Sequence, residues 1–173
     1  KLTFDTTGYD PSYIIVEKGT QFISNITGVP LPFTNLGTVN IFADEGGEFN
    51  GEIKIHQGEL KALEWTYDAI SESQSFLIKD DTCDRSTIQM LVNDKPWEVN
   101  TVLSELDGAS NVFFIQEGLD GVSEIYFGNG IFGKIPLDGQ SVRITYLSTK
   151  GAAGNYTSTI NEQTFALEST IDN

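Results

Sequence analysis

The chain has 173 residues and a formal net charge of −15, from 25 acidic and 10 basic residues. This acidic balance argues against binding to nucleic acid or to an anionic membrane, because both depend on a basic surface. No run of about 18 apolar residues occurs, which argues against a membrane-spanning helix. The length suits one full core or two small β-domains in tandem. A single cysteine, Cys83, excludes an internal disulfide and a cysteine-based metal site.

The only methionine is Met90, and the first residue is Lys1. We therefore expect a fragment or a processed product of a longer protein. The lone cysteine is typical of a protein made in a reducing cytoplasm.

Short β-like segments separated by turn residues fill the first part of the chain. Tyr13–Val16 and Gln21–Ser24 predict a hairpin, and Asn25–Leu36 predicts a loop because it contains glycine and two prolines. Thr38–Ala43 predicts a strand with Val39, Ile41 and Ala43 on one face. Two further alternating segments follow, with Ile53 and Ile55 sharing one face and Leu63, Trp65 and Tyr67 another; they are Glu52–His56 and Leu60–Asp68.

The middle of the chain continues the same pattern. Asp80–Arg85 is an acidic segment that we expect to be a solvated loop, and the apolar spacing from Val102 to Leu106 favours one short helical turn. The apolar strand in Asn111–Glu117 is expected to pair with the next one. The remaining predicted strands are Ser75–Lys79, Thr87–Asn93, Ser123–Phe127 and Ser141–Leu147.

Hairpin signals at this spacing, with almost no helix, predict an all-β fold. We expect an antiparallel β-sandwich or two small β-domains, with at most one short helix. The expected division is an N-terminal β-subdomain over residues 1–72, a β-domain over 73–155, and a C-terminal strand or arm over 156–173.

No group of residues forms a coherent catalytic or ligand-binding set. Asp44–Glu48 lacks the alternating acidic spacing of a calcium loop. His56, the only histidine, falls opposite an apolar face and is expected at the surface, without a triad partner nearby in the sequence. The acids around Cys83 would raise its pKa and oppose its use as a nucleophile. We therefore assign no catalytic, cofactor-binding or metal-binding residue and no cofactor, and we expect no enzymatic activity.

One motif imitates a dinucleotide-binding site. Gly128–Gly133 fits the pattern Gly-x-Gly-x-x-Gly and follows a predicted strand. That mechanism needs a helix to begin at the glycines, so that its amides hold a pyrophosphate. Here Pro136 and Asp138-Gly139 lead directly into another strand. The motif is therefore interpreted as a tight connection between two strands.

The same stretch resembles the baseplate J-like proteins of contractile phage tails, among them the baseplate wedge subunits of T4-like phages. The family pattern is a strand, Phe-Gly-Asp/Asn-Gly-x-Phe-Gly, a short proline-containing turn, a strand ending in tyrosine, and a glycine-rich tail. A weaker similarity lies at Ile14–Phe22, although Glu17-Lys18 replaces a frequent proline there. The matching residues are Phe127–Gly133, Ile135-Pro136, Val142–Tyr146 and Gly151–Asn155.

This resemblance implies a structural component of a phage tail baseplate wedge. Such a component would assemble a ring around the hub and rearrange when the tail contracts. It implies a homodimer or higher homo-oligomer that contacts other wedge subunits, is assembled in the host bacterial cytoplasm and is located in the virion. Short strands with open edges fit this role, because an edge offers unpaired N–H and C=O groups to a neighbour.

A carbohydrate-binding β-sandwich module is the alternative. Trp65, Tyr67, Trp97 and Tyr126 are possible stacking platforms for sugar rings, although large aromatic residues also dominate cores. A sugar-binding module should expose two aromatics on one face, whereas a wedge component should bury them. A hydrolase that uses Cys83 or a serine with His56 ranks last, because no spacing supports it.

Overall fold

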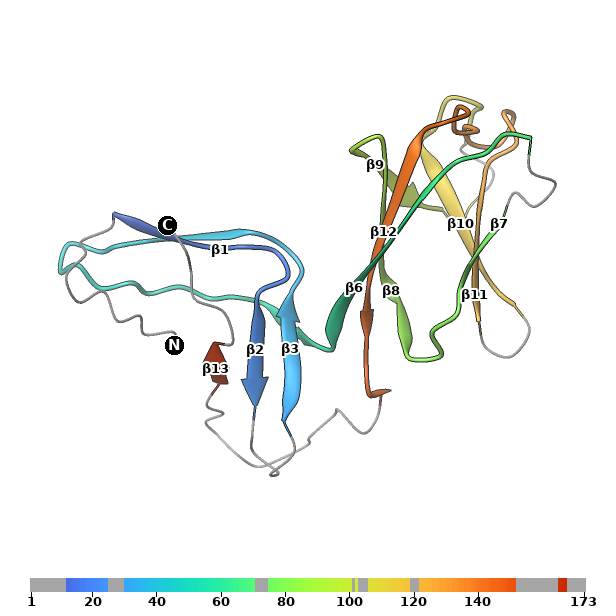
Figure 1. Ribbon diagram of the computed structural model, residues 1–173. Coiled ribbons are helices and arrows are strands. Elements are labelled where there is room, and N and C mark those ends of the chain that lie inside the picture. Colours follow the sequence, from blue (N-terminus) through green and yellow to red (C-terminus); the bar gives the residue numbers. More distant parts are fainter. Residues whose placement is uncertain are drawn as a thin grey trace. The chain divides into compact units, whose positions relative to one another are not determined.

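The structure is a computed structural model that describes residues 12–24, 30–70, 75–100, 102, 106–118, 122–151 and 165–167. Every helix or strand element assigned in this part of the chain is a β-strand (Figure 1), which confirms the all-β prediction. The chain divides into two compact units. We call Leu60–Thr149 the central unit, and Lys1–Glu59 together with Lys150–Asn173 the flanking unit. The division predicted at residues 72 and 155 stays a prediction about independently folding domains.

The central unit is built on a seven-stranded sheet in the order β6-β12-β8-β9-β10-β11-β7. The order of the strands in the sheet therefore differs strongly from their order along the chain. β9 and β10 run parallel, with Val112 opposite Glu98, whereas β10–β11, β11–β7, β8–β9 and β12–β8 are antiparallel. The strands are β6 (Glu59–Thr66), β7 (Ser75–Ile78), β8 (Cys83–Val92), β9 (Lys95–Val99), β10 (Val112–Glu117), β11 (Ser123–Phe127) and β12 (Ser141–Ser148).

The two outer strands of this order, β6 and β7, approach each other through their side chains. Trp65 of β6 stacks on Phe76 of β7, with ring centroids 3.8 Å apart. Lys61 Nζ of β6 lies 2.8 Å from Oδ2 of Asp80, which comes shortly after β7. The sheet is therefore folded over on itself around a core. The buried core residues are Tyr67, Ile78, Ile88, Met90, Val92, Trp97, Phe113, Ile125, Val142, Ile144 and Tyr146.

The flanking unit contains two smaller sheets. One consists of β1 and β4, and the other has the order β13-β2-β3-β5. Its core cluster contains Ile14, Val16, Phe22, Ile41 and Phe49. The other residues of the two predicted apolar faces pack against this cluster; they are Val39, Ala43, Ile53 and Ile55. The strands are β1 (Tyr13–Val16), β2 (Gln21–Ser24), β3 (Leu31–Asn35), β4 (Val39–Phe42), β5 (Ile55–Gln57) and β13 (Phe165–Leu167).

The predicted hairpin between the first two strands is wrong. β1 pairs with β4, and β2 pairs with β3 and β13. The chain changes sheets at Gly19, which has a φ of 90° and donates its N–H to the Asn35 carbonyl at 2.9 Å. A tight turn between two strands therefore does not oblige them to pair.

The loop predicted over Asn25–Leu36 is also wrong in its second half. Pro32 lies within β3, opposite Ile23, and its carbonyl accepts a hydrogen bond from Gly58 N–H at 2.9 Å. Proline is tolerated in a strand where its missing N–H is not needed. The acidic loop predicted over Asp80–Arg85 is shorter than expected, because β8 begins at Cys83.

The helical turn predicted from Val102 to Leu106 lies mostly outside the described residues, which include only its two ends, and neither end is helical. In the part of the chain that the structure describes, no helix is long and apolar enough to cross a membrane.

Candidate functional site

The loop between β11 and β12 is held in one conformation by its own hydrogen bonds. The side-chain oxygen of Asn129 accepts from the backbone N–H groups of Ile131 and Phe132, at 3.0 and 2.9 Å. Gly130 N–H donates to the Gly133 carbonyl at 2.9 Å, and both glycines have positive φ, 81° and 80°. Glycine adopts such angles without the steric cost of a Cβ atom. The glycine motif serves a turn, and no helix follows it in the fully described stretch up to β12.

This loop is anchored on the connection between β9 and β10, at one end of the central unit (Figure 1). Gly133 N–H donates to the Asp107 carbonyl, and Lys134 N–H to the Ser110 carbonyl, both at 2.9 Å. A Cβ atom on Gly108 would lie 2.0 Å from a backbone oxygen of the loop. The two connections are therefore packed backbone to backbone, and a larger residue at this glycine would separate them.

The loop exposes its large apolar residues, although one glycine and one proline within it are buried. Gly133 and Pro136 are buried. Its exposed large apolar side chains are Ile131, Phe132, Ile135 and Leu137, with exposed fractions of 68%, 45%, 42% and 66%. We call these four residues the apolar loop. Clustered exposed apolar residues usually mark a surface that another molecule covers.

A hydrogen-bonded carboxylate joins β6, the β7–β8 turn and β12. Asp80 Oδ2 accepts from Lys61 Nζ at 2.8 Å and from the Tyr146 hydroxyl at 3.1 Å, and Oδ1 accepts from Thr82 N–H at 3.0 Å. The Thr82 hydroxyl also donates to Oδ1. Burial alone would raise the pKa of Asp80, but the hydrogen bonds from Lys61, Thr82 and Tyr146 together hold it well below its usual range. Burial and the nearby carboxylate raise the pKa of Tyr146 to about 12. The network is a structural tie between strands that are distant in the sequence.

The two residues considered for nucleophilic catalysis belong to different units. Cys83 begins β8 in the central unit, and His56 lies half-buried in β5 of the flanking unit, opposite Thr34. Burial, together with the charges of Asp80 and Asp84, raises the pKa of Cys83 to about 11. A thiol with such a pKa is a poor nucleophile at neutral pH. Among the described residues, no cluster of His, Cys, Asp and Glu is arranged to hold a metal ion.

The four aromatic residues considered as sugar platforms do not form a shared exposed surface. Tyr67 and Trp97 are buried, with exposed fractions of 7% and 5%. Trp65 is half-buried with its ring against Phe76, and Tyr126 is half-buried against another aromatic ring. Two of the four are therefore core residues, and each of the other two stacks against a neighbouring aromatic ring.

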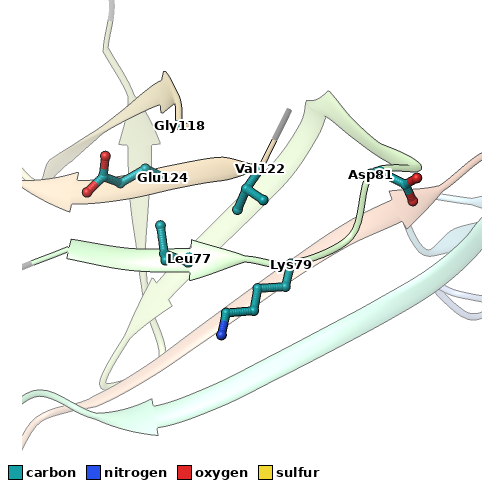
Figure 2. Close-up of a pocket in the computed structure, with 6 residues that line it drawn as sticks. All are labelled: Leu77, Lys79, Asp81, Gly118, Val122 and Glu124. Carbon is teal, nitrogen blue, oxygen red and sulfur yellow. The ribbon is translucent and has the colours of Figure 1, made fainter. Parts of the chain in front are cut away.

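A depression of about 540 Å³ lies over β7 and β11 (Figure 2). Leu77 and Glu124 are opposite each other in the pairing of these strands, so they share its floor. The lining residues are Leu77, Lys79, Asp81, Gly118, Val122 and Glu124. One cation and two carboxylates around two apolar side chains define no single class of ligand, and we assign none.

Of two other parts of the predicted resemblance, the structure describes one in full and the other at a single residue. Ile14–Phe22 forms most of β1, the sheet-changing turn and the start of β2. The glycine-rich tail, Gly151–Asn155, is described at Gly151 alone, and its other residues lie outside the described part.

Sequence reasoning missed the exposure of the apolar loop and the partial burial of Asp80. The first has a readable signal: four large apolar residues fall within seven positions of a Gly- and Pro-rich connection, where polar residues are usual. The second has none, since Lys61 and Tyr146 lie far from Asp80 in the sequence.

Comparison with known proteins identifies the family. The sequence profile described as "Bacteriophage baseplate wedge protein gp6, third domain" matches residues 60–149, the same bounds as the central unit. The chain is also 26% identical, over 171 residues, to the baseplate wedge protein gp6 of Enterobacteria phage T4. That alignment covers 87% of this chain and 25% of the T4 protein, so the chain spans about a quarter of that relative's length. The profile match covers more than half of the chain, which therefore belongs to the family of the bacteriophage baseplate wedge protein gp6.

Proposed function

We propose that this chain is a structural part of a baseplate wedge in a contractile phage tail. The observation that carries the proposal is the coincidence of the family match with the compact central unit, both over residues 60–149. The finer assignment to the baseplate J-like family rests on the pattern Phe127–Gly133 with Pro136 and Tyr146. In this role the chain catalyses no reaction and is located in the tail baseplate of the virion, after assembly in the host bacterial cytoplasm.

The mechanism would be mechanical. Wedge subunits would form a ring around the hub and rearrange when the tail contracts, with free energy spread over many contacts between subunits. A folded-over sheet tied by Asp80 and capped by a rigid loop suits a part that must keep its own shape while its contacts change. We infer contacts with other wedge subunits and with further copies of the same protein. The charge of −15 supports partners other than nucleic acid or membrane.

The first experiment is size-exclusion chromatography with light scattering on the full-length protein, alone and with the other wedge subunits of its phage. We expect a homodimer or larger homo-oligomer over a wide concentration range, and co-elution with at least one wedge subunit. A strict monomer that joins no wedge subunit would contradict the proposal. A glycan screen would then decide for or against the sugar-binding alternative, which the burial of Tyr67 and Trp97 disfavours.

A further inference from the structure

The apolar loop is held in one conformation by hydrogen bonds within the chain, without any partner. Besides the hydrogen bonds that Asn129 accepts, Leu137 N–H donates to the Gln140 side-chain oxygen at 2.7 Å. Gln140 N–H in turn donates to the Leu137 carbonyl at 3.1 Å. Gly139 N–H donates to the Tyr67 carbonyl at 2.9 Å, which fixes the loop to the end of β6. A surface that is already ordered loses little conformational entropy on binding.

Acidic side chains flank the apolar loop. Asp107, whose carbonyl holds Gly133, is exposed, and its carboxylate accepts hydrogen bonds from Ala109 N–H and the Ser110 hydroxyl. Asp138 follows Leu137 directly; it is exposed and accepts a hydrogen bond from backbone N–H of the β6–β7 connection at 3.0 Å. The connection between β11 and β12 carries one basic residue, Lys134.

We propose that the apolar loop docks on another protein subunit of the baseplate, at an apolar surface rimmed by lysine and arginine. Exposed apolar side chains supply the buried centre of such a contact, with Phe132 as an aromatic anchor. The carboxylates of Asp107 and Asp138 complement a basic rim and add specificity and speed of association. The same loop of a second copy is a poorer occupant, because it would bring the carboxylates of Asp107 and Asp138 against identical carboxylates. The inference rests on the proposed function and names the partner's chemistry.

The test measures association of the full-length protein with each purified wedge subunit of the same phage, by analytical ultracentrifugation. Leu137→Asp and Phe132→Asp should weaken the complex tenfold or more, about the loss expected at the centre of an interface. Phe42→Asp is the matched control, since Phe42 and Leu137 are exposed to nearly the same extent, 65% and 66%, and Phe42 lies in the flanking unit. It should leave the affinity unchanged.

A second arm tests the charge. The double variant Asp107→Asn with Asp138→Asn keeps an oxygen acceptor at each position but removes both charges. Binding should weaken a few-fold at low salt, and the affinity should fall less steeply as salt increases. An unchanged salt dependence would overturn the basic rim.

The outcomes separate the two proposals. If the wild-type protein joins no wedge subunit, the proposed function and the docking surface both fail. If it joins one and the Asp variants of the apolar loop bind equally well, only the docking surface fails. If those variants abolish self-association and leave binding to other subunits intact, the occupant is a second copy and the inference is overturned. A photo-crosslinker at position 132 should attach to an apolar segment with neighbouring lysine or arginine on a different subunit.

Discussion

The central and flanking units are built from the same kind of element but bury different amounts of apolar side chain. Among the described residues, the core cluster of the central unit has eleven buried members and that of the flanking unit has five. β8 has ten residues, and β6 and β12 have eight each, whereas β3, with five, is the longest strand assigned in the described flanking unit. Short strands in small sheets are only marginally stable. We therefore expect the flanking unit to open first.

The two tryptophans of the chain, Trp65 and Trp97, both lie in the central unit. Intrinsic fluorescence excited at the tryptophans therefore reports on that unit alone. Resistance to proteolysis within residues 12–59 reports on the other. This separation allows the two units to be compared within the 173-residue chain.

The largest effect is expected from truncating one core phenylalanine in each unit. Phe113 is 0% exposed and Phe22 is 2% exposed, so either change to alanine should cost about 3–5 kcal/mol within its own unit. Phe113→Ala should lower the urea midpoint of the fluorescence transition strongly. Phe22→Ala should leave that midpoint unchanged and speed proteolysis of the flanking unit. An equal fall of the midpoint in both variants would mean that the units unfold together.

Asp80 offers a second way to weaken the central unit alone. Asp80→Asn should lower its free energy of unfolding by about 1–3 kcal/mol at pH 7, because hydrogen bonds to a charged group are lost. The pKa of Asp80 is lower in the folded state than its unfolded value of about 3.9. Its contribution is therefore fully present above about pH 4 and is lost as the pH falls toward the folded pKa.

Urea unfolding of the wild type and of Asp80→Asn at pH 7 and pH 3 checks this sign. The difference between the two proteins should shrink at pH 3. Asp81→Asn, at an exposed neighbouring position, is the control and should change stability little. A difference that grows at pH 3 would refute the assignment of Asp80 as a stabilising carboxylate.

A matched pair of turn glycines gives a smaller and cleaner comparison. Gly139 in the central unit and Gly47 in the flanking unit have φ values of 79° and 77°, and no atom lies within 4 Å of a Cβ added at either. Each change to alanine should therefore cost only the backbone strain, about 1–2 kcal/mol. Gly139→Ala should shift the fluorescence midpoint and Gly47→Ala should not. A shift with both would again indicate coupled unfolding.

The smallest effect is expected at a surface ion pair. Arg143 Nε lies 3.0 Å from Glu64 Oε1, and the two side chains are 53% and 66% exposed. Arg143→Ala should change the free energy of unfolding by no more than about 0.5 kcal/mol, because solvent screens the pair. A loss of several kcal/mol would show that this contact between β6 and β12 matters to the closure of the sheet.

Several strands were predictable because their signal is local. Val112–Glu117 and Ser123–Phe127 pair as expected, and the predicted apolar faces of β4 and β6 pack against their cores. The partner of β1 was not predictable, since a tight turn at Gly19 looks the same whether the chain pairs back or changes sheets. Asp80 was read as solvated because its partners come from strands far along the chain.

Local residue patterns were enough to predict the all-β class, the alternation of buried and exposed faces, and the tight β11–β12 connection, because each depends on residues close together in the chain. Tertiary structure decided the strand order β6-β12-β8-β9-β10-β11-β7, the stacking of Trp65 on Phe76, and the exposure of the apolar loop. These depend on which distant strands satisfy each other's hydrogen bonds and cover each other's apolar faces. Only the folded sheet makes that selection, because pairing is non-local and many orders are compatible with the same local pattern.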